Sequence, residues 1–330
     1  MFRKGAKQVG WWQVSADTLA TGRFVISPLA ESIACLRTLH ESRAGDPAAR
    51  AWLSEHRPAY RARLANDPVT ALLVPAILGP NWTADFVTPP PAGEGDADLA
   101  SELAAVRRTS PAAALADVRL ALRGPVPDAL NRDDLPALTA SLLDWVWQEA
   151  VLPYWQRRRR ILEADIVART AKLSQHGWAA ALDDMRPGMR WLGNGRLQIN
   201  ILDYPPRDIS GARLFFVPVT PSFGWTAWDG PHRYAICYPC SGVLAQQVRA
   251  AQAPAALSAL LGAGRAAVLT RLDTPKSTTQ LVALTGQGLG SVGRHLQILL
   301  AASLIQRRRA GRSVLYYRTD AGEAVVAAQR

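Results

Sequence analysis

Apolar residues follow a helical period in two short segments near the C-terminus, which meet at Gly286. The second segment runs from Leu289 to Ala301. Its apolar side chains lie at i, i+4, i+7 and i+8 and form one stripe: Val292, Leu296, Leu299 and Leu300. Hydrogen-bonding side chains occupy the other face. This pattern predicts an amphipathic helix with an exposed polar side.

The first of the two segments begins at Ser277. Ser277 followed by Gln280 three residues later fits a capping box. The apolar side chains expected to pack on the second helix are Leu281, Val282 and Leu284. Gly286 suits the turn, because glycine adopts positive φ without steric cost. The order predicted for this stretch is helix, turn, helix.

A basic β-hairpin is predicted directly after the second helix. Ala310-Gly311 supplies the bend, and the returning strand carries the β-favouring residues Val314, Tyr316 and Tyr317. Four arginines cluster around the bend: Arg307, Arg308, Arg309 and Arg312. Guanidinium groups bind phosphate oxygens bidentately, so this hairpin is suited to a polyanion. The combined pattern predicts a winged helix-turn-helix.

The chain ahead of this region is predicted to be mostly helical up to about Asp184. Ser27-Pro28 reads as a helix start, with proline at the first helical position. Further helices are expected at Pro47–Leu64, Pro68–Ile77, Asp96–Arg108, Ala112–Leu122 and Leu135–Trp155. The arginine run 157–160 opens another helix. Contact with DNA or an acidic ligand is one interpretation of this run, but we prefer a solvated face with Glu163 and Asp165 as partners.

From about Arg190 the period changes to that of strands. Leu197, Ile199 and Ile201 alternate with polar residues, and Leu214–Val217 and Tyr234–Tyr238 are further strand candidates. The predicted fold class is therefore α+β, a mainly helical N-terminal body with a small β-sheet, followed by a C-terminal winged helix-turn-helix domain. Its parts are a flexible arm (1–14), a helical domain (15–184), a β-sheet region packed on it (185–252) and the winged domain (253–330).

Charge is concentrated at the C-terminal end. The net charge is +11, and residues 254–330 hold ten basic and three acidic residues, which is +7 of that total. This asymmetry points to a polyanionic partner for the C-terminal domain. Arginine outnumbers lysine and alanine is abundant, as is typical of a GC-rich genome. The number of arginines is therefore only partly evidence of function.

Double-stranded DNA is the partner that these features favour. The side chains expected to reach phosphates or base edges lie in the first helix, the second helix and the hairpin: Ser277, Thr278, Thr279, Gln287, Gly290, Ser291, Arg294, His295, Gln297, Arg307, Arg308, Arg309, Arg312, Ser313 and Tyr316. Arg294 and Ser291 are the candidates for base readout. His295 has the alternative role of a packing residue.

The C-terminal region resembles the DNA-binding domain of ArsR-family transcriptional regulators. The matching residues are Leu260-Leu261-Gly262, Arg265, Leu269, Leu281, Gly286, Ser291-Val292, His295-Leu296, Leu299, Leu304-Ile305, Gly311-Arg312, Val314 and Tyr316. Residues from Ser15 to Leu39 and from Asp165 to Pro239 resemble a long domain of unknown function that is fused to such domains in actinobacterial regulators. The resemblance implies a recognition helix at Leu289–Ala301, a wing tip at Arg309–Ser313 and a homodimer. The order of the motif and the concentrated positive charge favour a sequence-specific DNA-binding transcriptional regulator that acts as a repressor.

The sequence departs from the ArsR pattern at Gly290 and Gly293, where polar residues are usual. Each glycine costs an exposed helix interior about 1 kcal/mol against alanine. The glycines allow close approach of the backbone to DNA, or they reduce the number of base contacts.

A second hypothesis gives the N-terminal body the main role, as a small-molecule sensor or an enzyme with a secondary DNA-binding tail. Its basis is a candidate ligand pocket at Phe223, Trp225 and Trp228, for an unidentified effector. The alternative role for these aromatic residues is to cover the sheet.

Catalysis, metals and cofactors are not expected. Cys237 and Cys240 have the spacing of half a zinc site, but no second pair of ligands accompanies them. No catalytic motif stands out, and no apolar run is long enough to span a membrane. We therefore expect a non-enzymatic, cytoplasmic protein.

Overall fold

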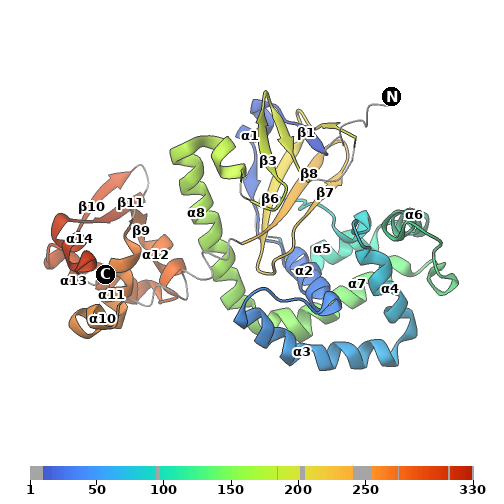
Figure 1. Cartoon of the computed structure of the whole chain (residues 1–330), viewed down its shortest axis with the longest axis horizontal. Coiled ribbons are helices and arrows are strands. Elements are labelled where there is room, and N and C mark those ends of the chain that lie inside the picture. Colours follow the sequence, from blue (N-terminus) through green and yellow to red (C-terminus); the bar gives the residue numbers. More distant parts are fainter. Residues whose placement is uncertain are drawn as a thin grey trace, which may run out of the picture. The chain divides into compact units, whose positions relative to one another are not determined.

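The computed structural model describes residues 10–93, 97–183, 185–200, 205–240, 254–273, 275–310 and 313–328 (Figure 1). The chain forms two compact units. The N-terminal unit comprises Met1–Arg158 and Arg169–Cys240, and the C-terminal unit comprises Arg159–Ala168 and Ser241–Arg330. Both helices and strands are present, as expected for an α+β chain.

Helices predominate in the described part of the N-terminal unit. They are α1 (Ala16–Ala20), α2 (Pro28–Glu41), α3 (Pro47–Asn66), α4 (Pro68–Leu78), α5 (Leu99–Arg107), α6 (Pro111–Leu122), α7 (Leu135–Val146) and α8 (Trp155–Leu182), through which the division between the units runs. Aspartate and serine side chains cap most of them, as at Ser27 of α2 and Asp46 of α3.

The predicted helices are largely confirmed, with one correction. The helix expected at Leu135–Trp155 is not continuous, because α7 ends at Val146. A π-helical turn (Trp147–Val151) and a 3-10 turn (Leu152–Tyr154) separate it from α8. Pro153 accounts for the break, since proline has no N–H to donate and its ring clashes with the preceding turn.

The larger sheet of the N-terminal unit has the strand order β2-β6-β8-β7. Strands β2 (Arg23–Phe24), β6 (Arg213–Val219) and β8 (Arg233–Pro239) are parallel, and β7 (Trp225–Asp229) runs antiparallel to β8. The strands expected at Leu214–Val217 and Tyr234–Tyr238 are thus confirmed. Alternate residues of β6 and β8 enter two different core clusters, so this sheet is buried on both faces.

A second sheet, in the order β3-β4-β1-β5, corrects the prediction of a flexible arm at 1–14 for residues 11–13, whereas residues 1–9 lie outside the described part of the chain. Strand β1 (Trp11–Gln13) pairs with β4 (Arg196–Gln198) and β5 (Arg207–Asp208), while β3 (Arg190–Gly193) forms an edge. Trp12 is 1% exposed. Burial of its indole ties this segment to strands 180 residues away in the chain. The predicted boundary at residue 184 therefore does not separate helices from strands. Ile201, predicted in a strand, lies outside the described residues.

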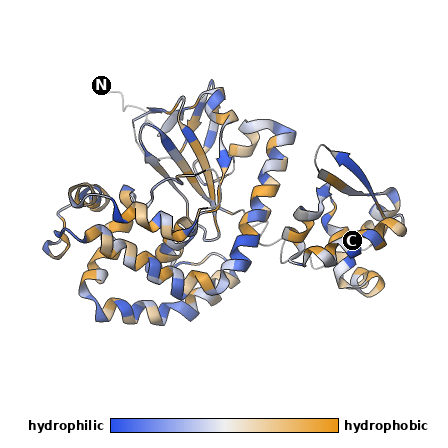
Figure 2. Cartoon of the chain, turned by 180° about the vertical axis from the view of Figure 1, so that it is seen from behind, coloured by the Kyte–Doolittle hydropathy of each residue, from blue (hydrophilic) through white to orange (hydrophobic). Residues whose placement is uncertain are grey.

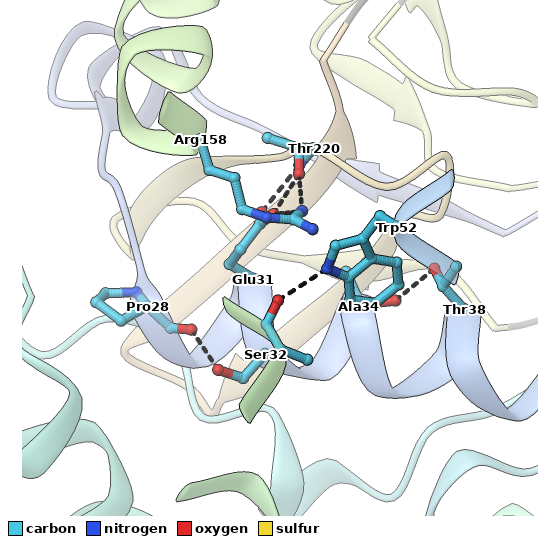
Figure 3. A network of polar contacts seen from close by, with 9 residues as sticks. Pro28, Glu31, Ser32, Ala34, Thr38, Trp52, Arg158 and Thr220 are labelled. Atoms are coloured by element: carbon cyan, nitrogen blue, oxygen red, sulfur yellow. Dashed lines mark hydrogen bonds and ion pairs between the residues drawn. The ribbon is translucent and has the colours of Figure 1, made fainter. Parts of the chain in front are cut away.

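Buried polar contacts join α2, α8 and the segment after β6 (Figure 3). Glu31 is fully buried and forms an ion pair with Arg158 at 2.7 Å. The backbone N–H of Thr220 donates to the other Glu31 oxygen at 2.9 Å, and the Arg158 guanidinium lies 5.0 Å from the Trp52 ring. The arginine run is therefore not uniformly solvated, because Arg158 points into the core. Arg159 pairs with Glu163 as expected, at 2.9 Å.

Besides Arg159–Ala168 of α8, the described part of the C-terminal unit runs from Pro254 onward and is built from helices and a three-stranded sheet. The elements are α10 (Ala255–Leu261), α11 (Ala263–Arg271), β9 (Lys276–Ser277), α12 (Thr278–Thr285), α13 (Leu289–Ala301), β10 (Ile305–Ala310), β11 (Ser313–Arg318) and α14 (Asp320–Ala327). Its sheet has the order β10-β11-β9. Leu257, Leu269, Leu281, Val292, Leu296 and Ile305 belong to one core cluster of this unit.

None of the helices in the described ranges combines the length and the apolar composition needed to cross a membrane.

Candidate nucleic-acid interface

Helices α12 and α13 are joined by a short turn whose geometry matches its sequence. The Ser277 backbone N–H donates to Gln280 Oε1 at 2.7 Å, and the Gln280 N–H donates to Ser277 Oγ at 3.3 Å, which completes the predicted capping box. Gly286 ends α12 with φ of 68°. That left-handed conformation costs glycine nothing, so the turn can be this tight.

Helix α13 has one buried face and one exposed face. Its buried face holds Val292, Leu296 and Leu299, each no more than 1% exposed. The side chains of Ser291, Arg294 and Gln297 are exposed on the opposite face. Arg294 makes no hydrogen bond or ion pair with any described residue. The polar face predicted for the second helix is therefore free in the described part of the chain.

The backbone at the beginning of α13 is not covered by other described parts of the chain. A Cβ atom added to Gly288, Gly290 or Gly293 would meet nothing within 4 Å, and none of the three has positive φ. No side chain caps this helix end, and Leu289 between two of these glycines is 63% exposed. The fold of the C-terminal unit thus requires neither the glycines nor the leucine at these positions. Leu289 was not among the residues predicted to contact DNA, because on this helix mainly hydrogen-bonding side chains were considered.

His295 does not lie on the free face of α13. Its half-buried ring packs over Gly264 of α11, where an added Cβ would come within 2.5 Å of Nε2. Burial, together with Arg265 and Arg294, lowers the pKa of His295. The contact with Gly264 supports the alternative role of His295, that of a packing residue, over a contact with DNA. Gln287, which is also half-buried, donates to the Gly264 carbonyl at 3.4 Å.

Strands β10 and β11 form the predicted hairpin, and their register orders its arginines. Arg307 lies opposite Tyr316, Arg308 opposite Leu315 and Arg309 opposite Val314. Since side chains alternate along a strand, Arg307 and Arg309 share the face of the buried Ile305, and Arg308 points to the other face. The arginines therefore form two sets, which the sequence analysis had treated as one.

The three hairpin arginines are exposed, and none forms a hydrogen bond or ion pair with a described residue. Figure 2 shows the β10 strand as strongly hydrophilic. Other cations of the same unit already have partners. Arg318 pairs with Glu323 at 3.0 Å and donates to the Leu272 carbonyl, and Lys276 pairs with Asp273. Positive charge on the hairpin is thus available to a partner.

The remaining predicted contacts divide into three groups. Ser277 uses its hydroxyl in the capping box, and half-buried Tyr316 packs against the core of the unit. Thr278, in the first turn of α12, is half-buried. Arg312 and the side chains of Thr279 and Ser313 lie outside the described residues.

The aromatic residues predicted to line one ligand pocket are separated by the strand geometry. Trp225 and Trp228 are three positions apart on β7, so they point to opposite faces. Phe223 stacks on Trp225 at 5.6 Å, whereas Trp228 lies beneath Arg207 at 3.9 Å and beside Trp82. The prediction of one shared pocket is wrong for Trp228. Trp225 and Trp228 are close in sequence, but the prediction did not consider that side chains alternate between the two faces of a strand.

Cys237 and Cys240 are both buried, and the described residues contain no group of three or more histidine, cysteine or acidic side chains arranged for a metal ion.

Comparison of the chain with protein-family models, curated proteins and solved structures found no match.

Proposed function

We propose that the C-terminal unit is a winged helix-turn-helix domain and that the protein is a sequence-specific DNA-binding transcriptional regulator of the ArsR type. The observation that carries the proposal is the combination of an exposed polar face on α13 with three hairpin arginines, at 307–309, that have no partner among the described residues. Arg307, Arg308 and Arg309 supply phosphate contacts, which account for most non-specific affinity. In this proposal the protein binds as a homodimer and acts as a repressor.

Base readout falls to the first turns of α13. Arg294 is suited to guanine, since guanidinium binds O6 and N7 bidentately. Leu289 supplies an exposed apolar group for a thymine methyl. Gly290 and Gly293 leave the helix backbone bare, which supports close approach of α13 to the duplex.

The test is selection of bound fragments from a random duplex library with the full chain, followed by binding measurements on the enriched sequence and a scrambled duplex at several salt concentrations. We expect an enriched motif, bound at least 10³-fold more tightly than the scrambled duplex. A steep salt dependence without any enriched motif would identify a generic nucleic-acid binder. The absence of duplex binding would remove the proposal.

Within this design, Arg294→Ala should relax the preference at one position of each half-site. A uniform loss on all sequences would assign Arg294 to phosphate binding instead. Arg107→Ala is the charge-matched control, because it removes an exposed arginine from the N-terminal unit, away from the proposed interface.

A further inference from the structure

Ile298 lies on the exposed side of α13, away from the core of the C-terminal unit. Successive residues of an α-helix are about 100° apart around the axis, so Ile298 points almost opposite to the buried Leu296. Its side chain is 41% exposed and takes no part in the core cluster formed by the described residues of this unit. Single exposed apolar side chains are common on protein surfaces, so the position of Ile298 carries more weight than its exposure.

The neighbours of Ile298 on this side of the helix are polar. Arg294 lies one turn earlier and Ser291 two turns earlier, in one row along α13. Both side chains are exposed, and Arg294 has no partner among the described residues. The row therefore presents a hydroxyl, a guanidinium and an apolar group in that order.

This combination of groups matches the chemistry of base edges in the major groove. Guanine presents O6 and N7 to a guanidinium, whereas thymine presents a C5-methyl group to an apolar side chain. Arg294 and Ile298 are four residues apart, which is about 6 Å along the helix axis. That distance corresponds to about two steps of duplex DNA, at about 3.4 Å for each step. When Arg294 binds a guanine, a methyl group one or two base pairs away is therefore within reach of Ile298.

We propose that Ile298 is a specificity-determining residue that contacts the C5-methyl group of a thymine one or two base pairs from the guanine bound by Arg294. This inference rests on the proposed function and extends base readout one turn further along α13. The contact removes two apolar groups from water, so the preference for thymine depends on the methyl group itself.

The test uses the duplex that the full chain enriches and replaces its thymines one at a time with uracil. Uracil keeps the base pair and removes only the C5-methyl group. We expect one position in each half-site at which uracil weakens binding of the unsubstituted protein about fourfold, as the loss of one buried methyl group predicts. In Ile298→Ala the same replacement should have no effect. Ile298→Val, which keeps a branched apolar side chain, should retain most of the uracil effect.

Leu289→Ala is the matched control, because it removes another exposed apolar side chain from the first turn of the same helix. It should leave the uracil effect at the Ile298 position unchanged. The unfolding temperature of Ile298→Ala should equal that of the unsubstituted protein, since the side chain is exposed. A loss of thymine preference in this variant is then not a loss of folding.

The outcomes separate this inference from the proposed function. If the unsubstituted protein binds no duplex, both are overturned. If it binds an enriched duplex but no uracil replacement weakens binding, or if the uracil effect persists in Ile298→Ala, only the role of Ile298 is overturned. The same holds if Ile298→Ala changes the oligomeric state in sedimentation and not the thymine preference, because Ile298 would then contact a second copy of the chain.

Discussion

Arginine serves opposite purposes in the two units. In the N-terminal unit Arg37, Arg158 and Arg169 are largely buried and are engaged with carboxylates, carbonyls or aromatic rings. In the C-terminal unit Arg307, Arg308 and Arg309 are exposed and unpartnered among the described residues. In the amino-acid composition, these six arginines cannot be distinguished from one another. Only their surroundings separate cations that stabilise a fold from exposed cations that are available to a partner.

The difference follows from desolvation. A buried guanidinium that loses its partner leaves an uncompensated charge in the core, so its removal or that of its partner is costly. An exposed guanidinium is fully hydrated and contributes little to stability, yet it displaces a counterion when it meets a phosphate. Substitution should therefore affect stability in one unit and salt-dependent binding in the other.

The largest expected effect is at the Glu31–Arg158 pair (Figure 3). Glu31→Ala should lower the free energy of unfolding by about 3–5 kcal/mol, because it leaves the Arg158 charge unpaired in the core. Denaturant titration measures the loss. Arg157→Ala, an exposed neighbour, should change it by less than about 0.5 kcal/mol.

Replacing both partners, Glu31→Leu with Arg158→Met, should cost less than Glu31→Ala alone. If the double variant is less stable than Glu31→Ala, then the ion pair stabilises the fold more than the apolar pair that replaces it.

The next effect concerns a buried carboxyl of the same unit. Burial raises the pKa of Glu102 to about 7, although Ser27 and the Leu29 N–H donate to it. Because the folded pKa lies above the unfolded one, the native state holds the proton more tightly. The stabilising contribution of Glu102 is fully present below about pH 4.5 and is lost as pH rises to about 7, a change of up to about 3 kcal/mol.

Denaturant titrations at pH 5, 6, 7 and 8 test this contribution. Glu102→Gln should flatten the decline in stability over that interval relative to the unsubstituted protein. Glu149→Gln, at an exposed position, should leave the decline intact. Parallel profiles for Glu102→Gln and the unsubstituted protein would contradict the assignment.

In the C-terminal unit, replacing Arg307, Arg308 and Arg309 with alanine should reduce DNA affinity without changing the unfolding temperature. The salt dependence of log K should fall by about 0.9 for each phosphate contact removed. Arg107→Ala, an exposed arginine of the N-terminal unit, is the control.

The hairpin register sharpens this prediction. Arg307→Ala and Arg309→Ala, on one face, should resemble each other in their effect on the salt slope and differ from Arg308→Ala. Equal effects from all three would mean that the duplex contacts both faces of the hairpin or only its tip.

The smallest effect on stability is expected from replacing a glycine of α13, and this change should stabilise the protein, not destabilise it. Gly293→Ala should stabilise the protein by up to about 1 kcal/mol, since the added methyl meets open space in a helix. The same variant should weaken DNA binding severalfold if the duplex approaches the bare backbone. Gly286→Ala, at φ of 68°, should instead destabilise. If Gly293→Ala binds DNA with unchanged affinity, then the glycines do not serve to let the duplex approach the helix backbone.

Local patterns were sufficient where a residue acts on its immediate neighbours. The capping box at Ser277, the glycine turn at Gly286 and the apolar stripe of α13 were all predictable, because spacing along a helix sets which side chains meet. The central strands β6 and β8 were also predictable, because a strand that is buried on both faces consists of a nearly continuous run of apolar residues.

Pairings between distant segments were not predictable in this way. Nothing near Trp11–Gln13 indicates a strand, because its partners lie far along the chain, β4 from Arg196 and β5 from Arg207. Likewise Arg158 meets Glu31 across 127 positions, so the run of four arginines reads as a solvated face until its partner is known.

The sequence alone determined the order of elements in the C-terminal unit and the excess of positive charge there, since both are properties of neighbouring residues. Tertiary structure alone decided which polar side chains remain free. It placed His295 over Gly264, buried most of the Arg158 side chain and left the Trp225 indole N–H without an acceptor among the described residues. The physical reason is that desolvation and pairing depend on what surrounds a group in space, and most of those surroundings come from distant parts of the chain.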